Sequence, residues 1–242
     1  MHLTRILAVA ASIVVVSAAC SSTSDTASGT TVTTQATPTT AALQTTPSGY
    51  AAYRLQPTAC GAEQSDPAVA MQFEAPGDAG IDGMTTVVLE TSCGPLEIEL
   101  DPSIAPETVN SFVFLAESGY FDGTVSHRII PGFMMQAGDP TATGLGGPGY
   151  TIPDEFPEES AYDRGVIAMA NAGPGTTGSQ FFIMFADGPL PPNFSIFGQV
   201  VDGFDTLDRI ELIQLGRSPT SADPTPSTPL ESLYIESVTI LP

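Results

Sequence analysis

A series of short strand-like segments separated by turn residues constrains the fold of this chain most strongly. Between residues 85 and 240, apolar and polar residues alternate over a few positions at a time, and Gly, Pro or Asn separates one segment from the next. Such period-two alternation is typical of half-buried β-strands. It predicts a hairpin over residues 85–100, with its turn at 92–94, and further strands at residues 125–130, 133–137, 165–170, 180–185, 196–201 and 233–240.

Only two segments favour helices. Pro106 suits a first helical position and Glu107 suits the positive end of a helix. Gly119 ends a run of apolar residues at helical spacing, and a second helix is predicted over residues 204–215. Many short strands with two modest helices favour a barrel or sandwich over a doubly wound sheet. The apolar residues of the first helix are Val109, Phe112, Val113 and Ala116.

The charge balance excludes several classes of partner. The chain has 27 Asp and Glu residues against 6 Lys and Arg, all of them Arg, for a net charge of -21. A chain this acidic repels nucleic-acid phosphates and anionic lipid headgroups, so we expect neither as a partner. Only His2 and His127 are available as imidazole ligands, so we expect no metal site.

The first twenty residues have the layout of an export signal. An apolar run at residues 6–16 is too short to span a bilayer, and small residues follow it. Cys20 comes after two alanines and resembles the lipobox cysteine of bacterial lipoproteins, although Ser17 departs from that pattern. We therefore expect a signal peptide at 1–19 and a protein anchored outside the cell membrane by lipid on Cys20, with a secreted soluble protein as the alternative.

The rest of the chain divides by composition. Residues 20–57 are rich in Ser, Thr and Pro and predict a disordered tether, followed by an extension at 58–83 and one folded domain at 84–242. The patch at 218–229 predicts a surface loop. Cys60 and Cys93 are the cysteines left after Cys20, and in an oxidising compartment we expect a disulfide between them. The Gly-rich residues 138–149 contain no Lys and predict a turn-rich loop rather than a phosphate cradle.

Two long motifs define the domain more closely. Residues 127–139 read HRIIPGFMMQAGD, and residues 169–183 read MANAGPGTTGSQFFI. From about residue 85 to 240 the chain resembles the cyclophilin family of peptidyl-prolyl cis/trans isomerases. The resemblance implies a mainly β fold, a closed eight-stranded antiparallel barrel capped by two α-helices. It also implies catalysis of X-Pro rotation without a cofactor.

The resemblance assigns Arg128 as the catalytic residue. Rotation about an X-Pro amide needs no nucleophile, because its barrier of about 18–20 kcal/mol comes from resonance in the C–N bond. A guanidinium can donate to the imide nitrogen only as the amide twists, which stabilises the transition state selectively. By the same resemblance, the peptide is bound by Phe133, Met134, Gln136, Ala170, Asn171, Gln180, Phe182, Leu190 and Phe194.

The expected partners are proline-containing peptides and unfolded exported proteins, bound by a monomer. His127 precedes the arginine in the family too, but strand alternation turns it away from the pocket, so we interpret it as structural. Phe194 stands where many members carry a His, which leaves the range of peptides open. A catalytically weak module that only holds proline-containing peptides is the alternative function.

Overall fold

The computed structural model describes residues 48–156, 161–217 and 223–242. The expected signal segment at 1–19, the candidate lipid site Cys20 and the tether as far as residue 47 lie outside the described residues. Within the three described ranges, no helix has both the length and the apolar character needed to cross a membrane.

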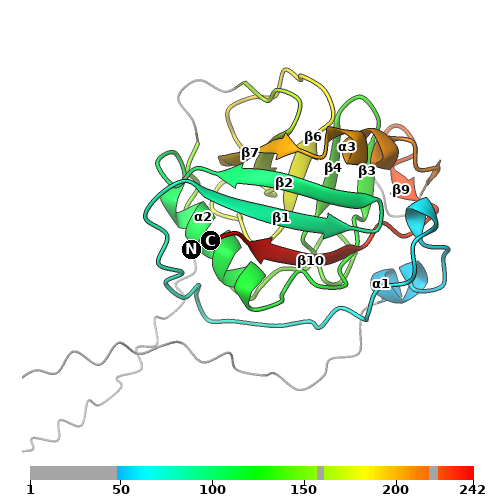
Figure 1. Ribbon diagram of the computed structural model, residues 1–242, viewed down its shortest axis with the longest axis horizontal. Coiled ribbons are helices and arrows are strands. Elements are labelled where there is room, and N and C mark those ends of the chain that lie inside the picture. Colours follow the sequence, from blue (N-terminus) through cyan, green and yellow to red (C-terminus); the bar gives the residue numbers. More distant parts are fainter. Residues whose placement is uncertain (1–47, 157–160, 218–222) are drawn as a thin grey trace, which may run out of the picture. The chain divides into compact units, whose positions relative to one another are not determined.

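A curled antiparallel sheet of eight strands forms the body of the domain (Figure 1). All eight predicted strands are present, with ends that differ from the prediction by a few residues. In spatial order they are β10 (Ile235–Ile240), β1 (Thr85–Thr91), β2 (Gly94–Leu100), β7 (Ile196–Asp202), β5 (Val166–Met169), β6 (Phe181–Met184), β4 (Met134–Ala137) and β3 (Arg128–Ile130).

The sheet is an open half-barrel, so the expectation of a closed barrel is wrong. The edge strands β10 and β3 form no ladder with each other. Residues just before them make one isolated bridge, Val125 with Tyr234, and the amide of Ser126 donates to the carbonyl of Leu233 at 2.9 Å. The residues that meet the start of β10 are 123–126, which precede β3 and belong to no strand, so the two edge strands share no ladder.

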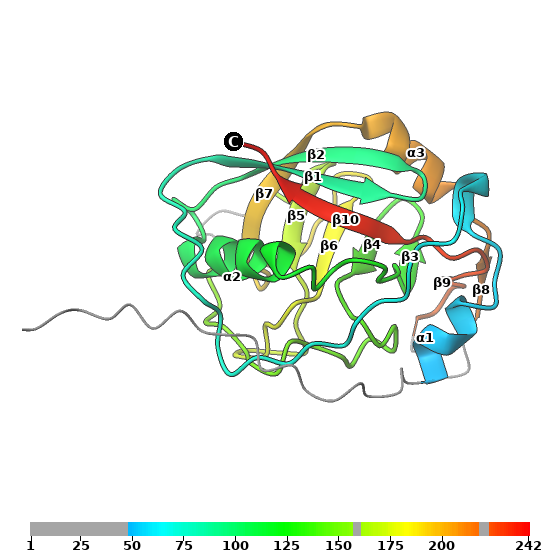
Figure 2. The same cartoon turned by 60° about the horizontal axis from the view of Figure 1, so that its bottom comes forward.

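The first predicted helix packs into the core of the sheet. Helix α2 (Pro106–Glu117) begins at the expected proline, and its Phe112 is buried against the rings of Phe121, Phe181 and Phe197. The carboxylate of Glu155 accepts hydrogen bonds from the first amides of the helix, which satisfies donors that a helix start leaves open. The helix contacts β10 (Figure 2).

The second predicted helix is shorter than expected. Helix α3 (Phe204–Glu211) packs against β2 and ends four residues before the predicted boundary at 215. Residues beyond it pair instead, as β8 (Leu215–Gly216) and β9 (Thr228–Pro229) form a two-stranded ribbon. The segment predicted as a surface loop at 218–229 therefore ends in a strand, and its residues 218–222 lie outside the described part of the chain.

A segment before the sheet, residues 48–83, runs along the domain, and we call it the strap (Figure 2). It begins with α1 (Ser48–Tyr53), whose Tyr50 and Tyr53 are buried in a small apolar cluster with Val125 and Tyr234. The predicted end of the tether, residue 57, therefore lies too far along the chain, because residues 48–57 include a packed helix. A 3-10 turn, η1 (Ala59–Gly61), follows.

The structure joins Cys60 of the strap to Cys93 of the β1–β2 turn by a disulfide, with 5.1 Å between the two Cα atoms. This separation lies within the range that a bridge requires. The bond fixes the middle of the strap to the sheet across 33 residues of chain.

Candidate active site

The strand register gathers the predicted site residues on one face of the sheet. Arg128 on β3 lies opposite Gln136 on β4, and Gln136 lies opposite Phe182 on β6. Directly opposed residues point to the same side of a sheet. The intervening positions, Ile129, Met135, Ile183 and Ile167, pair in the same way and are fully buried in the main core on the other side.

A cavity of about 160 Å³ opens on this face, and we call it the proline cup. All of the predicted site residues except Gln180 line it. They are Arg128, Phe133, Met134, Gln136, Ala170, Asn171, Phe182, Leu190 and Phe194.

The floor of the proline cup is apolar and held in place from below. Phe182 and Phe194 meet edge to face at 5.5 Å between ring centroids, and Met134 is buried beside them. The hydroxyl of Tyr162 donates to the carbonyl of Phe194 at 2.9 Å and accepts from its amide at 3.2 Å. Tyr162 thus positions Phe194, a role for which the sequence carried no signal. A shallow apolar cavity of this kind suits a pyrrolidine ring.

The guanidinium of Arg128 is held at the edge of the proline cup by hydrogen bonds on two sides. Its Nε and Nη2 donate to the carboxylate of Asp223 at 2.8 and 2.7 Å, and Nη1 donates to Oε1 of Gln136 at 3.1 Å. Gln136 in turn donates to Oε1 of Gln180 at 2.9 Å, and Gln180 donates to the carbonyl of Gly146. Gln180 therefore belongs to the site as a support for Gln136.

Described residues bind three of the five N–H groups that an arginine carries. The Arg128 side chain keeps 33% of its surface exposed, whereas that of Asp223 keeps 14%. These three bonds fix the plane of the guanidinium, and Arg128 lines the proline cup. Sequence reasoning missed Asp223, because it lies in a Ser/Thr/Pro-rich patch with no motif around it.

The edge of the proline cup that would lie beside a peptide backbone is formed by Ala170 and Asn171. The amide of Ala170 is already used in a bond to the carbonyl of Gln180. The side chain of Asn171 donates to the carbonyl of Asn193 at 2.8 Å and accepts from the amide of Gly173 at 3.1 Å. Asn171 is thus fixed by its own neighbours and gives this edge a defined shape.

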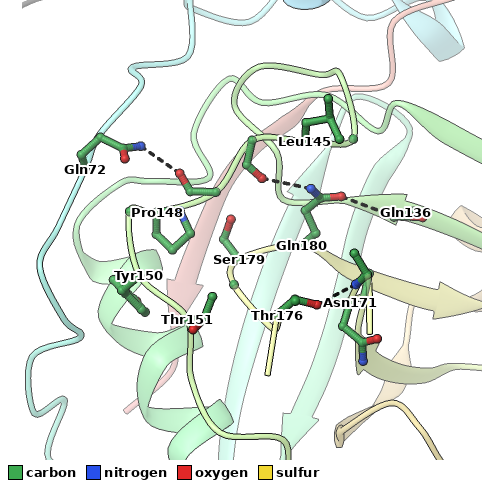
Figure 3. A pocket seen from close by; sticks show the side chains of 17 residues that line it. Gln72, Gln136, Leu145, Pro148, Tyr150, Thr151, Asn171, Thr176, Ser179 and Gln180 are labelled. Carbon is green, nitrogen blue, oxygen red and sulfur yellow. Dashed lines mark hydrogen bonds between the residues drawn. The ribbon is translucent and has the colours of Figure 1, made fainter. Parts of the chain in front are cut away.

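A larger cavity of about 630 Å³ adjoins the proline cup and shares Gln136, Ala170 and Asn171 with it. Figure 3 shows it between the Gly-rich loop, the segment around Thr176 and Ser179, and Gln72 of the strap. The sequence predicted the Gly-rich residues as a loop but gave no sign that they form a cavity wall.

The Gly-rich wall is built around a buried carboxylate. Asp139 accepts hydrogen bonds from the amides of Thr141, Thr143, Gly144 and Gly146. Burial alone would raise the pKa of Asp139, but the bonds from Thr141 and Gly146 hold it below its usual value. A Cβ at Gly146 would lie 1.9 Å from Oδ1 of Asp139, so only glycine fits there.

His127 is half-buried and lies outside the lining of the proline cup, as the strand alternation predicted. Its Nδ1 has no hydrogen-bond partner among the described residues. Burial lowers its pKa to about 4, with smaller opposed contributions from Asp139 and Arg128, so the ring is neutral at pH 7. Its main-chain carbonyl accepts a bond from the hydroxyl of Tyr53 at 3.1 Å. In the described ranges, no group of three or more His, Cys, Asp and Glu side chains is placed to hold a metal ion.

Comparison with known proteins agrees with this geometry. The family model described as cyclophilin type peptidyl-prolyl cis-trans isomerase/CLD matches residues 86–239. The chain is 44% identical over 160 residues to peptidyl-prolyl cis-trans isomerase-like 2 of Cryptococcus neoformans, a match covering 63% of this chain but only 27% of that protein. It is 43% identical over 172 residues to the probable peptidyl-prolyl cis-trans isomerase A of Mycobacterium bovis, covering 64% of this chain and 91% of that one.

The fold is also similar to a solved structure. A cyclophilin type peptidyl-prolyl cis-trans isomerase of Cryptosporidium parvum, crystallised in the presence of the dipeptide Ala-Pro, superposes with a TM-score of 0.59 at 37% identity. The match covers 65% of this chain and 99% of that one. Relatives of similar identity come from fungi and vertebrates as well as from Mycobacterium.

Proposed function

The chain belongs to the family of cyclophilin-type peptidyl-prolyl cis-trans isomerases, and on that basis we propose that its folded domain accelerates X-Pro rotation with Arg128 as the catalytic residue. One observation carries the proposal. A guanidinium held by Asp223 and Gln136 stands at the edge of an apolar cavity of about 160 Å³ on the same face of the sheet.

The mechanism follows from what twisting does to the imide. In the planar imide, the nitrogen shares its lone pair with the carbonyl group and accepts no hydrogen bond. When the bond twists, the nitrogen regains that lone pair. With the pyrrolidine ring seated on Phe182 and Met134, an N–H of Arg128 donates to the nitrogen as the lone pair appears. Because this bond exists only in the twisted state, it lowers the barrier without tightening ground-state binding.

The support around Arg128 matters because a flexible arginine would have to be ordered during each turnover. The two bonds to Asp223 and the bond to Gln136 order the Arg128 side chain when the protein folds, so its conformational entropy is already lost before peptide binds. The guanidinium is therefore oriented in advance. No step in this scheme uses a nucleophile, a general base or a cofactor.

A turnover assay separates this function from the alternative, a catalytically weak module that only holds proline-containing peptides. The full chain is mixed with a short X-Pro peptide, and cis-to-trans conversion is followed by protease-coupled cleavage. We expect rate acceleration at catalytic concentrations of protein, unchanged by a metal chelator. Peptide binding by calorimetry without acceleration would establish the holding module instead.

The proposed substrates are proline-containing segments of unfolded exported proteins, handled by a monomer. The Ala-Pro dipeptide accompanies the structure of the Cryptosporidium isomerase and supports this chemistry by analogy. The relatives described above do not address export, which rests on the sequence of residues 1–20 alone. The net charge of -21 supports peptide clients over nucleic acid.

We also propose that the protein is anchored by lipid on Cys20 at the outer face of the cell membrane, so that its active site faces exported chains. Replacing Cys20 by Ser in the full chain should move the protein from the membrane fraction to the soluble exported fraction without changing turnover on a small peptide. A wild-type protein that is already soluble, with no lipid mass at its mature N-terminus, would establish the secreted alternative.

A further inference from the structure

The strap, residues 48–83, lies outside the residues that the family model matches, which begin at 86. It nevertheless fits closely into the domain. A Cβ at Gly123 would lie 2.2 Å from the carbonyl oxygen of Asp66, and one at Gly149 would lie 2.8 Å from that of Phe73. Both glycines have positive φ, and at both the absence of a side chain lets the backbone of the strap approach closely. The strap is therefore a packed part of the domain.

Residues 72 and 73 of the strap bind the wall of the larger cavity. The amide of Phe73 donates to the carbonyl of Pro148 at 2.7 Å, and Nε2 of Gln72 donates to that of Gly147 at 2.8 Å. Phe73 is buried against the rings of Phe114 and Tyr120, at 5.1 and 6.4 Å between centroids. Because Phe73 is anchored in the core, the position of Gln72 at the rim is fixed (Figure 3).

The chemistry of the larger cavity is unusual for so acidic a chain, since none of its lining residues is charged. A basic peptide side chain would meet no carboxylate there, and an acidic one would enter against a net charge of -21. The lining offers uncharged hydrogen-bonding groups instead, among them the Thr151 hydroxyl and Oε1 of Gln72, whose Nε2 already donates to the carbonyls of Met71 and Gly147. An uncharged hydrogen-bonding side chain is the best match for these groups.

The two cavities share the lining residues Gln136, Ala170 and Asn171 and therefore adjoin. We expect an extended peptide with its proline in the cup to place a neighbouring residue in the larger cavity. We propose that the strap gives this isomerase a specificity-determining residue, Gln72, which favours X-Pro substrates carrying Ser, Thr, Asn or Gln at the position that enters the larger cavity. This proposal rests on the proposed function. It adds to the domain a recognition element from outside the matched fold.

The test measures the activity of the full chain on peptide substrates of two lengths. The first substrate is a minimal X-Pro peptide that reaches only the proline cup. The second is a set of longer peptides in which each non-proline position carries Ser, Asn, Leu, Asp or Lys in turn. The catalytic efficiency kcat/KM is measured for wild type, for Gln72→Ala and for Gln64→Ala. Gln64 is the matched control, a strap glutamine that also makes side-chain hydrogen bonds but does not line the cavity.

We expect wild type to prefer Ser and Asn at one position of the longer peptides. Gln72→Ala should lower that preference by about fivefold, the factor that one net hydrogen bond supplies. It should leave the minimal peptide unaffected, and Gln64→Ala should keep the wild-type profile. An unchanged profile in Gln72→Ala would overturn the proposal, as would equal losses on the minimal and longer peptides.

Failure of the proposed function would look different, because wild type would then not turn over even the minimal peptide. In that event the same peptides are titrated calorimetrically. Loss of the Ser and Asn preference in Gln72→Ala would support a role for Gln72 in peptide binding. Identical affinities of wild type and Gln72→Ala for every peptide would rule that role out.

Discussion

The carboxylate of Asp223 binds the guanidinium of Arg128 through two parallel hydrogen bonds, from Nε at 2.8 Å and from Nη2 at 2.7 Å. The two residues are 95 positions apart in the sequence. Asp223 is itself held, because Arg217 donates to the carbonyls of Asp223 and Pro224 at 3.0 and 2.8 Å. Arg217 and Asp223, which lie between β8 and β9 in the chain, thus support the residue to which we assign catalysis.

Removing the Asp223 carboxylate should slow turnover by freeing the guanidinium. We expect Asp223→Ala to lower kcat by roughly threefold to tenfold with little change in KM, since the bond orients Arg128 and does not touch peptide. Asp223→Asn keeps the shape of the side chain and one acceptor oxygen, so its kcat should lie between those of wild type and Asp223→Ala. Steady-state kinetics on a minimal X-Pro peptide provides the measurement. A rise in KM at constant kcat would show that Asp223 acts on peptide binding instead.

Acid should destabilise the folded domain through His127. The unfolded chain binds a proton on this ring near its ordinary pKa of 6.5, whereas burial lowers the folded pKa to about 4. Between these values the unfolded state carries more protons, so the free energy of unfolding falls as the pH drops. The loss amounts to as much as about 3 kcal/mol at pH 4. Urea unfolding at pH 7, 5.5 and 4 measures it.

His127→Gln provides the control for the acid effect. This variant has no titrating ring, so its stability should vary less between pH 7 and 4 than that of wild type. The contribution of Asp139 belongs to a lower pH, because its pKa is held below the ordinary value of 3.8. Parallel curves for wild type and variant would show that His127 does not cause the acid loss.

The Cys60–Cys93 disulfide should stabilise the fold without serving catalysis. Closing 33 residues of chain restricts the unfolded state by about 3–4 kcal/mol. Cys60→Ser should lose that stability in guanidinium unfolding and should no longer respond to reductant, while it keeps activity on a minimal peptide because no strap residue lines the proline cup. Intact mass after alkylation verifies the bond in wild type. Equal unfolding midpoints for wild type with and without reductant would contradict this.

Resemblance to the cyclophilin family, and not local pattern, assigned Arg128 and Gln136 to the site. Local pattern predicted the two strands that carry them, and the structure puts Arg128 and Gln136 on one face of the sheet and Ile129 and Met135 on the other. Side-chain direction in a strand depends only on position along it, so it can be read without knowing the partner strands. The same argument correctly turned His127 away from the proline cup.

Contacts between distant segments could not be predicted in this way. Asp223 and Gln72 lie in polar stretches without periodicity, and only the folded chain brings one to Arg128 and the other to Gly147. Helix α1 was missed because a six-residue segment with two core tyrosines gives too short a pattern. The open edge between β3 and β10 depends on where each strand stops, and strand ends are weakly encoded.

The catalytic efficiency of Arg128→Ala, measured against wild type on a minimal X-Pro peptide, tests the central claim most directly. Arg209→Ala is the matched control, because that arginine is on the exposed surface of α3 and pairs with Asp205 and Thr206 of the same helix. We expect Arg128→Ala to lose about a hundredfold in kcat/KM while it keeps the wild-type circular dichroism spectrum, and Arg209→Ala to lose almost nothing. A folded Arg128→Ala protein with near wild-type kcat/KM would contradict the account.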